Sequence, residues 1–396
     1  MYGKLSDRVI LHCDLNNFFA SVETYFDPAL SDFPMAVCGS REERHGIVLA
    51  KNEKAKKSGV KTAETIWQAK QKCPELLCVP PHYKWYCAFS KRVREIYCEY
   101  TDMVEPFGID ECWLDVTGSG LLFGTGEEIA DTLRKRIKRE MGLTISVGVS
   151  FNKVFAKLGS DMKKPDAVTV ISHENFKEKI WCLPPDSIIG VGKSTMTVLN
   201  KLGLLTLGDV ALCPPELLIK HLGKQGLEIW QSANGFEHSG VISENEAPAA
   251  KSYSNGTTPG SNIKGAEEVK RTLIPLAENI SRQMRRDGVI ASTVSLSVRD
   301  INLVRTERQK KLSEPTRLAD SLVSAAMELY FGNFSSMPEL RSVTICASNL
   351  INDGVCSQMS LFSDVEKEEK AERLEAQIEA IRKKYGKASI KRGFDA

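Results

Sequence analysis

The sequence predicts an α+β protein built from several domains, and three observations support this fold class. The chain has 396 residues, which corresponds to two or three domains of average size. Strand-like and helix-like patterns alternate over the first 170 residues, whereas residues 176–235 show helical patterns interrupted by glycines. A polar stretch at 238–250 then separates these parts from a second region of mixed strand and helix patterns.

The first 170 residues contain most of the predicted secondary structure. Short apolar runs predict strands at 9–14, 34–38, 46–50, 103–107, 112–116 and 143–149. Apolar residues at every fourth position predict an amphipathic helix at 127–141, and shorter helical patterns cover 18–25, 63–71 and 153–158. Between two of these strands, the sequence GID indicates a hairpin.

The region after the linker combines helices with half-exposed strands. Helical patterns cover 267–286 and 317–331. Apolar residues alternate with small polar or basic ones at 293–299 and again at 342–347, which predicts two strands with one polar face. Apolar positions at 374–381 predict a charged amphipathic helix in the tail, although a solvated segment would have a similar composition.

Composition narrows the possible classes of protein. Apolar residues make up 42% and charged ones 26%, which excludes disorder of the whole chain. The net charge of +2 indicates no general preference for nucleic acid, but the basic surplus lies within 251–350 and favours a polyanion there. The sequence has no apolar window of membrane-spanning length. Eleven cysteines without a C-x-x-C pair predict reduced thiols, and hence a cytoplasmic protein.

Carboxylates at strand ends are the first indication of chemistry. Asp14 ends an apolar strand, and Asp110 and Glu111 lie at the predicted hairpin. Three converging carboxylates would suit hard divalent cations, and two such ions can hold the attacking and leaving oxygens of phosphoryl transfer. Each acid alone could equally be solvated or cap a helix, and the sequence does not show that Asp14 and Asp110 meet.

Three motifs in order resemble those of the Y-family, or translesion, DNA polymerases. They are HCDLNNFFASVE at 12–23, GIDECWLD at 108–115 and SVGVS at 146–150, the last followed by NKVFAK and SDMKKP. Their order and separations are similar to the bacterial DNA polymerase IV branch, over residues 8–350. Several linked motifs are more specific than a single one. The resemblance implies a template-directed DNA polymerase that adds deoxynucleotides to a primer 3′ end, with low fidelity and tolerance of damaged templates.

The resemblance also implies an architecture, a right-hand polymerase. Its parts would be a ferredoxin-like palm at 1–22 and 81–172, small fingers at 23–80, and a helical helix-hairpin-helix thumb at 173–237. The linker at 238–250 would lead to an α+β little finger at 251–350 and a tail at 351–396. We expect a monomer that binds primer–template DNA and deoxynucleoside triphosphates.

In this family the motif acids bind two Mg²⁺ ions in the palm. The resemblance implies that Asp14, Asp110 and Glu111 are the catalytic metal ligands, helped by the backbone carbonyl of Leu15. The 3′-hydroxyl of the primer would attack the α-phosphate of the nucleotide and release pyrophosphate.

The resemblance places four side chains at the nucleotide. Phe19 is similar to the steric gate that excludes a 2′-hydroxyl. Phe18 lies beside it, and because one of these two rings must be core, the motif position favours Phe18 for that role. Lys164 and Lys56 would contact the phosphates.

Three residues in this region depart from the family pattern. Glu53 and Lys56 stand where a tyrosine and an arginine are usual, and Asn17 stands where an aromatic residue is common, so the details of the nucleotide contacts are expected to differ.

Two segments are candidates for binding DNA. The sequence IIGVGK at 188–193 resembles a helix-hairpin-helix, in which Gly190, Gly192 and Lys193 would meet a phosphate; an ordinary turn between helices is the alternative. In the little finger, Arg299 and the polar strand faces would contact phosphates, unless those faces are only solvated. The basic residues at 305–311 could belong to a solvated loop.

The tail contains the sequence QMSLF, which resembles the clamp-binding peptide of bacterial replication proteins. Gln358, Leu361 and Phe362 would bind the sliding clamp. Leu361 and Phe362 could instead pack against their own domain.

Two other functional classes remain open at this point. One is a non-catalytic DNA-binding or scaffold relative of the same fold, against which the three intact acids argue. The other is a metal-dependent nuclease, which uses similar acids. Incubating primer–template with Mg²⁺, with and without deoxynucleotides, separates both from a polymerase.

Overall fold

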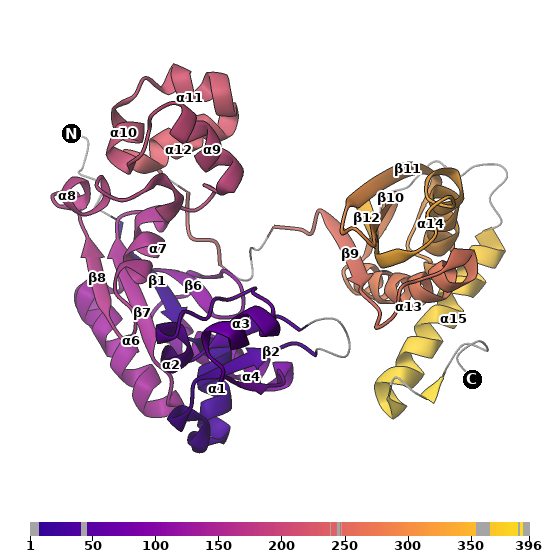
Figure 1. Ribbon diagram of the computed structural model, residues 1–396, viewed down its shortest axis with the longest axis horizontal. Coiled ribbons are helices and arrows are strands. Elements are labelled where there is room, and N and C mark those ends of the chain that lie inside the picture. The colour runs from indigo at the N-terminus through magenta and orange to yellow at the C-terminus, as the bar shows by residue number, and fades with distance from the viewer. Residues whose placement is uncertain are drawn as a thin grey trace. The chain divides into compact units, whose positions relative to one another are not determined.

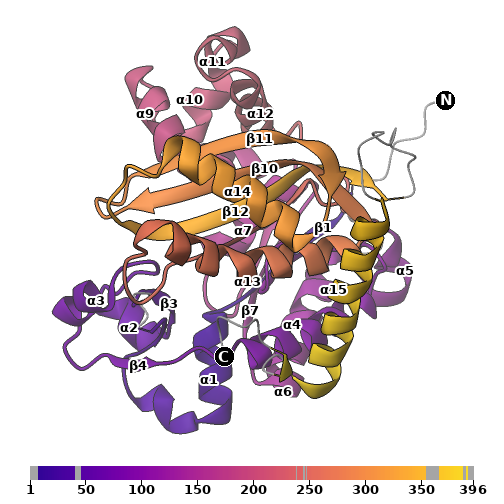
Figure 2. The same ribbon diagram turned by 90° about the vertical axis from the view of Figure 1, so that its right-hand side faces the viewer.

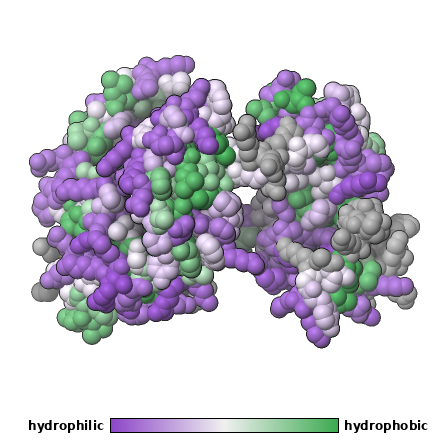
Figure 3. Space-filling view, turned by 60° about the horizontal axis from the view of Figure 1, so that its bottom comes forward, coloured by the Kyte–Doolittle hydropathy of each residue, from purple (hydrophilic) through white to green (hydrophobic). Residues whose placement is uncertain are grey.

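The computed structural model describes residues 8–40, 46–237, 239–243, 246, 248–353, 365–386 and 389–390. The chain divides into two compact units, of which the first extends to Ala247, apart from residues 40–45, and the second begins at Pro248 (Figure 1). No described helix is both long enough and apolar enough to cross a membrane. Hydrophilic residues predominate on the face shown in Figure 3, where apolar residues form small separate groups.

A five-stranded sheet forms the centre of the first unit. Its strand order is β5-β6-β1-β7-β8, and all neighbours are antiparallel except β7 and β8. The strands are β1 (Ile10–Leu15), β5 (Val104–Pro106), β6 (Glu111–Asp115), β7 (Ile145–Ser150) and β8 (Val168–Ile171). The predicted hairpin is confirmed, because β5 and β6 pair on either side of it.

Helices cover this sheet on both faces (Figure 1). Leu11 and Cys13 of β1 share a core with α6 (Gly126–Met141) and α4 (Tyr83–Cys98), whereas Ile10 packs with Ala156 of α7 (Lys153–Met162). Alternation along the strand therefore turns Ile10, His12 and Asp14 toward the face of α7. The short elements α1 (Phe18–Phe26), η2 (Thr117–Ser119) and α5 (Gly120–Phe123) complete this region.

A small three-stranded sheet, of order β3-β2-β4, lies in the segment expected to form the fingers. Asn52 is its organising residue, because its side chain accepts from the backbone N–H groups of Ala55 and Met35 and thereby caps α2. The elements are η1 (Pro28–Asp32), β2 (Met35–Cys38), β3 (Val48–Lys51), α2 (Glu53–Lys57), α3 (Ile66–Lys72) and β4 (Leu77–Val79).

The helical segment that follows β8 is confirmed. Its core includes Leu199 and Val210 together with Phe155 of α7, so these helices pack against the main sheet layer. The elements are α8 (Phe176–Ile180), η3 (Pro185–Ser187), α9 (Lys193–Lys201), α10 (Leu207–Leu212), α11 (Pro215–Leu222) and α12 (Lys224–Ala233).

The second unit is a four-stranded antiparallel sheet of order β11-β10-β12-β9. Two long helices cover one of its faces (Figure 2), and their apolar residues form a single core with the strands. The elements are β9 (Ser252–Thr257), α13 (Gly265–Arg286), β10 (Val289–Asp300), β11 (Arg305–Thr316), α14 (Ala319–Asn333), β12 (Leu340–Asn352) and the tail helix α15 (Val365–Tyr385).

In the second unit, one alternative is excluded and one expectation is wrong. The basic residues at 305–311 do not form a solvated loop but lie in strand β11. The small residues Thr293, Ser295 and Ser297 are buried rather than exposed. Longer neighbours cover them: Arg305 donates to Ser297 over 2.7 Å, and Asn349 donates to Thr293 over 2.9 Å.

The tail helix α15 is not a solvated segment. The Glu375 carboxylate binds Arg285 and accepts from the Ser281 hydroxyl (2.7 Å) and from the backbone N–H of Ala319 (3.0 Å), at the start of α14. In addition, Arg317 binds Glu372 over 3.0 Å. Polar contacts therefore dock this helix on the second unit, whereas Leu374 and Ile381 are exposed.

A close approach between β7 and α7 gives a test of the fold. A Cβ atom added at Gly148 would lie 1.9 Å from the Ala156 carbonyl oxygen and 2.5 Å from the Ser160 nitrogen. We expect Gly148→Ala to lower the free energy of unfolding by about 3 kcal/mol or more, because backbone must move. Urea unfolding followed by circular dichroism measures this.

The matched control is Gly120→Ala, since Gly120 has helical backbone angles and no atom within 4 Å of an added Cβ. It should change stability by less than about 1 kcal/mol. Equal effects of the two substitutions would contradict this packing.

Candidate active site

Register brings the predicted acids together at one end of the five-stranded sheet. Asp14 on β1 lies directly opposite Glu111 on β6, so both side chains emerge on the same face. The backbone N–H of Leu15, the last residue of β1, donates to the carbonyl oxygen of Asp110 over 3.0 Å. The structure thus unites residues that lie almost a hundred positions apart in the sequence.

Lysines bind two of these carboxylates. Lys164 donates to Asp14 over 2.6 Å and to Asp161 over 2.8 Å, and Lys157 donates to Glu111 over 2.6 Å. Lys157 was not predicted as a site residue, although it lies within the third motif. Lys157 lies within α7, and Lys164 lies just after its end.

The three carboxylates differ in their proton affinity. Burial raises the pKa of Asp14 to about 6, against the opposing effect of the Lys164 ammonium group. Burial, followed by the negative charge of Glu111, also raises the pKa of Asp110. For Glu111, contacts with His12 and Lys157 outweigh the effect of burial and lower its pKa to about 2.

His12 lies completely buried beneath the acids and was missed by the sequence analysis. Its Nδ1 atom is 2.8 Å from the Ser160 hydroxyl, which itself donates to the Lys157 carbonyl. The other ring nitrogen, Nε2, faces the Glu111 carboxylate at 3.6 Å. The only available signal was its position two residues before Asp14 on the same face of the strand.

The donor set suits a hard divalent cation. Asp14, Asp110 and Glu111 supply carboxylate oxygens, and the Leu15 carbonyl lies at the same sheet end. In the described part of the chain, no three His, Cys, Asp or Glu side chains form a ready-made metal site. The lysine contacts explain why these carboxylates do not form such a site, because Lys164 and Lys157 occupy carboxylate oxygens that a metal ion would need.

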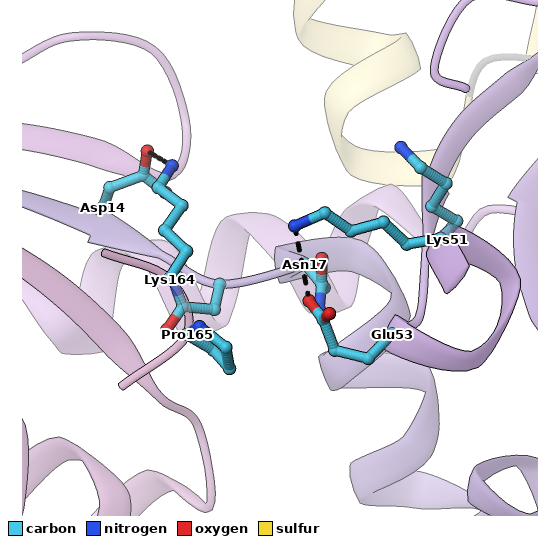
Figure 4. A pocket seen from close by; sticks show the side chains of 8 residues that line it. Asp14, Asn17, Lys51, Glu53, Lys164 and Pro165 are labelled. Carbon is cyan, nitrogen blue, oxygen red and sulfur yellow. Dashed lines mark hydrogen bonds and ion pairs between the residues drawn. The ribbon is translucent and has the colours of Figure 1, made fainter. Parts of the chain in front are cut away.

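A pocket of about 150 Å³ opens beside Asp14. Figure 4 shows Asp14 and Lys164 on one side of it, and Asn17, Glu53 and Lys51 on the other. Lys51, the last residue of β3, was not predicted as a site residue, although it precedes the predicted Lys56 by only a few positions and lines the same pocket. The lining residues are Asp14, Asn16, Asn17, Lys51, Glu53, Lys56, Lys164 and Pro165. Its three lysines make the pocket suitable for a polyanion.

Backbone contacts fix the position of Lys164. The backbone N–H of Asp166 donates to the Asn16 side chain over 2.9 Å, and the Asp166 carboxylate binds Arg134 (2.8 Å) and Lys138 (2.7 Å) of α6. These contacts anchor the loop that carries Lys164 to both the sheet and a helix.

The two phenylalanines at the start of α1 have different environments. Phe18 is 3% exposed and belongs to the core of the unit. Phe19 is partly buried, and its ring stacks on that of Tyr86 with centroids 4.1 Å apart and planes at 10°. Phe19 therefore has the fixed, partly accessible ring that a steric gate requires. Phe18 is buried beside it and could affect the gate only by packing against the Phe19 ring.

The predicted DNA-contacting residues lie in both units. Gly190 adopts a left-handed φ of 89°. Gly192 is the residue before α9, and this helix therefore has no side-chain cap at its N-terminus. Gly192 and Lys193 border a surface hollow at this helix N-terminus. In the second unit, Arg299 is exposed and pairs with Arg305 across β10 and β11. The predicted clamp peptide, with Gln358, Leu361 and Phe362, lies outside the described residues.

Comparisons with known proteins agree with this geometry. The model of the impB/mucB/samB family matches residues 13–161, and the model of that family's C-terminal domain matches residues 250–361. Over 387 residues the chain is 47% identical to the DNA polymerase IV of Acetivibrio thermocellus, covering 98% of this chain and 97% of that protein. The DNA polymerase IV 2 of Bacillus subtilis is 35% identical over 393 residues, covering 98% and 94% of the two chains.

A solved structure agrees as well. A Y-family DNA polymerase chimera of Dbh and Dpo4 matches with a TM-score of 0.75 and 25% identity, covering 87% of this chain and 99% of the other. The right-hand fold is thereby confirmed, and nothing supports the nuclease or non-catalytic alternatives. The chain belongs to the Y family of DNA polymerases, in its bacterial DNA polymerase IV branch.

Proposed function

We propose that Asp14, Asp110 and Glu111 are the metal ligands with which this DNA-directed, translesion DNA polymerase catalyses phosphoryl transfer. The observation that carries the proposal is the direct opposition of Asp14 and Glu111 at the sheet end, beside a pocket lined by lysines. Polymerases of this family depend on divalent metal ions, and we assign two Mg²⁺ ions to this site. When bound, they would stabilise the attacking and leaving oxygens of the displacement.

The proposed roles in binding metal and phosphate are as follows. Asp14, with the Leu15 carbonyl, would hold metal from β1, and Asp110 and Glu111 would hold it from the hairpin before β6. Lys164 and Lys157, which bind these carboxylates in the structure, would bind phosphate oxygens when their carboxylates hold metal. On the fingers side, Lys56 would contact the same triphosphate.

Selection against ribonucleotides would rest on Phe19. Its ring is held by stacking on Tyr86, so it cannot move aside at low cost when a 2′-hydroxyl approaches. Phe18, buried behind it, would support this position.

The proposed domains follow the boundaries stated above: palm, fingers, thumb, linker, little finger and tail. Gly190, Gly192 and Lys193 would bind a DNA phosphate at the start of α9. Arg299 would contact phosphates from the open face of the little-finger sheet. We further propose that the enzyme is a cytoplasmic monomer and that Gln358, Leu361 and Phe362 bind the sliding clamp.

The first prediction from the proposed function concerns metal. Asp110→Ala should lower primer extension by more than about a hundredfold, because a ligand of the catalytic ions is lost. Binding of primer–template, measured by fluorescence anisotropy, should stay within about threefold of wild type, since phosphate contacts dominate DNA affinity. Asp102→Ala, an exposed acid of the same region, is the control and should extend normally. Extension by the Asp110 variant within tenfold of wild type would refute the assignment.

The second prediction concerns sugar selection. Phe19→Ala should raise incorporation of ribonucleotides relative to deoxynucleotides by at least about tenfold, because space opens for the 2′-hydroxyl. Single-nucleotide incorporation with each triphosphate measures this ratio. Phe18→Leu, which weakens the support behind this ring, should lower thermal stability and raise the ratio by less than Phe19→Ala does. If the Phe19 variant extends primers with an unaltered ratio, the gate lies elsewhere.

The third prediction concerns the clamp. The double change Leu361→Ala, Phe362→Ala should leave clamp-free synthesis unchanged and abolish stimulation by a loaded clamp, because tethering raises the effective enzyme concentration at the primer end. Leu374→Ala, at an exposed position of α15, should retain stimulation. Retained stimulation in the double variant, with lower thermal stability, would mean that these residues pack on their own domain.

A further inference from the structure

Two of the residues that depart from the family pattern bind each other on one side of the pocket. The side-chain amide of Asn17 donates to the Glu53 carboxylate over 2.9 Å, and both residues line the pocket (Figure 4). Asn17 is the residue before α1 and has a left-handed φ of 50°, yet its side chain does not cap that helix. Because the backbone of Asn17 is left-handed rather than extended, its side chain does not reach the helix N–H groups, and its amide donates to Glu53 instead.

Glu53 also faces the lysine that is proposed to contact the triphosphate. Its carboxylate lies 3.7 Å from the Lys56 ammonium group, one turn along α2. The third lysine of the pocket, Lys51, donates to the Thr62 hydroxyl over 3.0 Å. Glu53 is therefore an anion placed among the cations to which a triphosphate would bind.

The other carboxylate–lysine pairs of the site differ from this one in their chemistry. Lys164 and Lys157 are bound by Asp14 and Glu111, which are proposed metal ligands, so metal ions can neutralise those acids as the lysines are released. Glu53 lies on α2 of the fingers segment and is not among the proposed ligands. Its negative charge would therefore remain in the pocket when the nucleotide binds.

We propose that Glu53 competes with the triphosphate of the incoming nucleotide for Lys56 and thereby weakens nucleotide binding, and that Asn17 holds Glu53 in this position. The inference rests on the proposed function and adds a residue that sets nucleotide affinity. The effect would act on the phosphates alone, so it would be the same for all four bases. It would also diminish as salt screens the charge.

The test is Glu53→Gln, which keeps an oxygen to accept from Asn17 and removes only the charge. The KM for each deoxynucleotide should fall by about three- to tenfold, as expected for a half-exposed charge near a polyanion, with a smaller change in kcat. The inhibition constant of pyrophosphate should fall by the same factor, and both differences should shrink at high salt.

The matched control is Glu75→Gln, an exposed acid of the same segment outside the pocket, which should alter neither constant. An unchanged or raised KM in Glu53→Gln would overturn the inference. So would a raised KM in both Glu53→Ala and Asn17→Ala with no change in Glu53→Gln, because the hydrogen bond rather than the charge would then matter. Wild-type enzyme that fails to extend primers would instead refute the proposed function.

Discussion

The pairing of β1 with its two neighbours is the constraint on which the site depends. Asp14 faces Glu111 on one side and Ser146 on the other, and every second residue of β1 points to the same face. A shift of one residue in this register would turn Asp14 into the apolar core and bring Cys13 to the surface. The cores on the two faces prevent such a shift, because Leu11 and Cys13 fill one and Ile10 fills the other.

The electrostatics of the site follow from this packing. The sheet end is partly buried, so the carboxylates resist ionisation unless a cation is near, and the pKa of Asp14 rises even with Lys164 in contact. The lysines compensate for the acids in the described structure, each on its own carboxylate. The same lysines would serve a triphosphate once metal ions replaced them. One set of cations can thus stabilise both the free site and the bound substrate.

In the second unit, the polar face of the sheet is formed in two layers of side chains. Its central strand carries small polar residues on the face away from the helices, and longer side chains from β11 and β12 reach over them. The exposed groups of this face are therefore those of the longer side chains, such as the Arg305 guanidinium. The tail helix joins this unit through carboxylate–guanidinium pairs, such as Glu372 with Arg317, so its docking depends on charge more than on apolar burial.

The fold class, the family and most elements of regular periodicity can be predicted from the sequence alone. The six strands predicted in the first 170 residues lie within two residues of their predicted bounds, because alternation and glycine breaks are local signals. The acids, Phe19 and the family departures at Asn17 and Glu53 were also visible as motif positions. The helix α4, the short strands β4, β8 and β9 and the strand β11 were missed, since their sequences lack a regular period or are too polar to indicate a strand.

Which residues share the site depends on how the elements pack together. That Asn17 binds Glu53, that Lys157 holds Glu111 and that His12 lies buried beneath the acids all depend on contacts between elements far apart in the chain. The polar residues of α15 and of β10 likewise gave no local sign of burial, because their partners are supplied by other elements. Local patterns fix which face of an element is apolar, whereas the pairing of polar groups is fixed only when the elements meet.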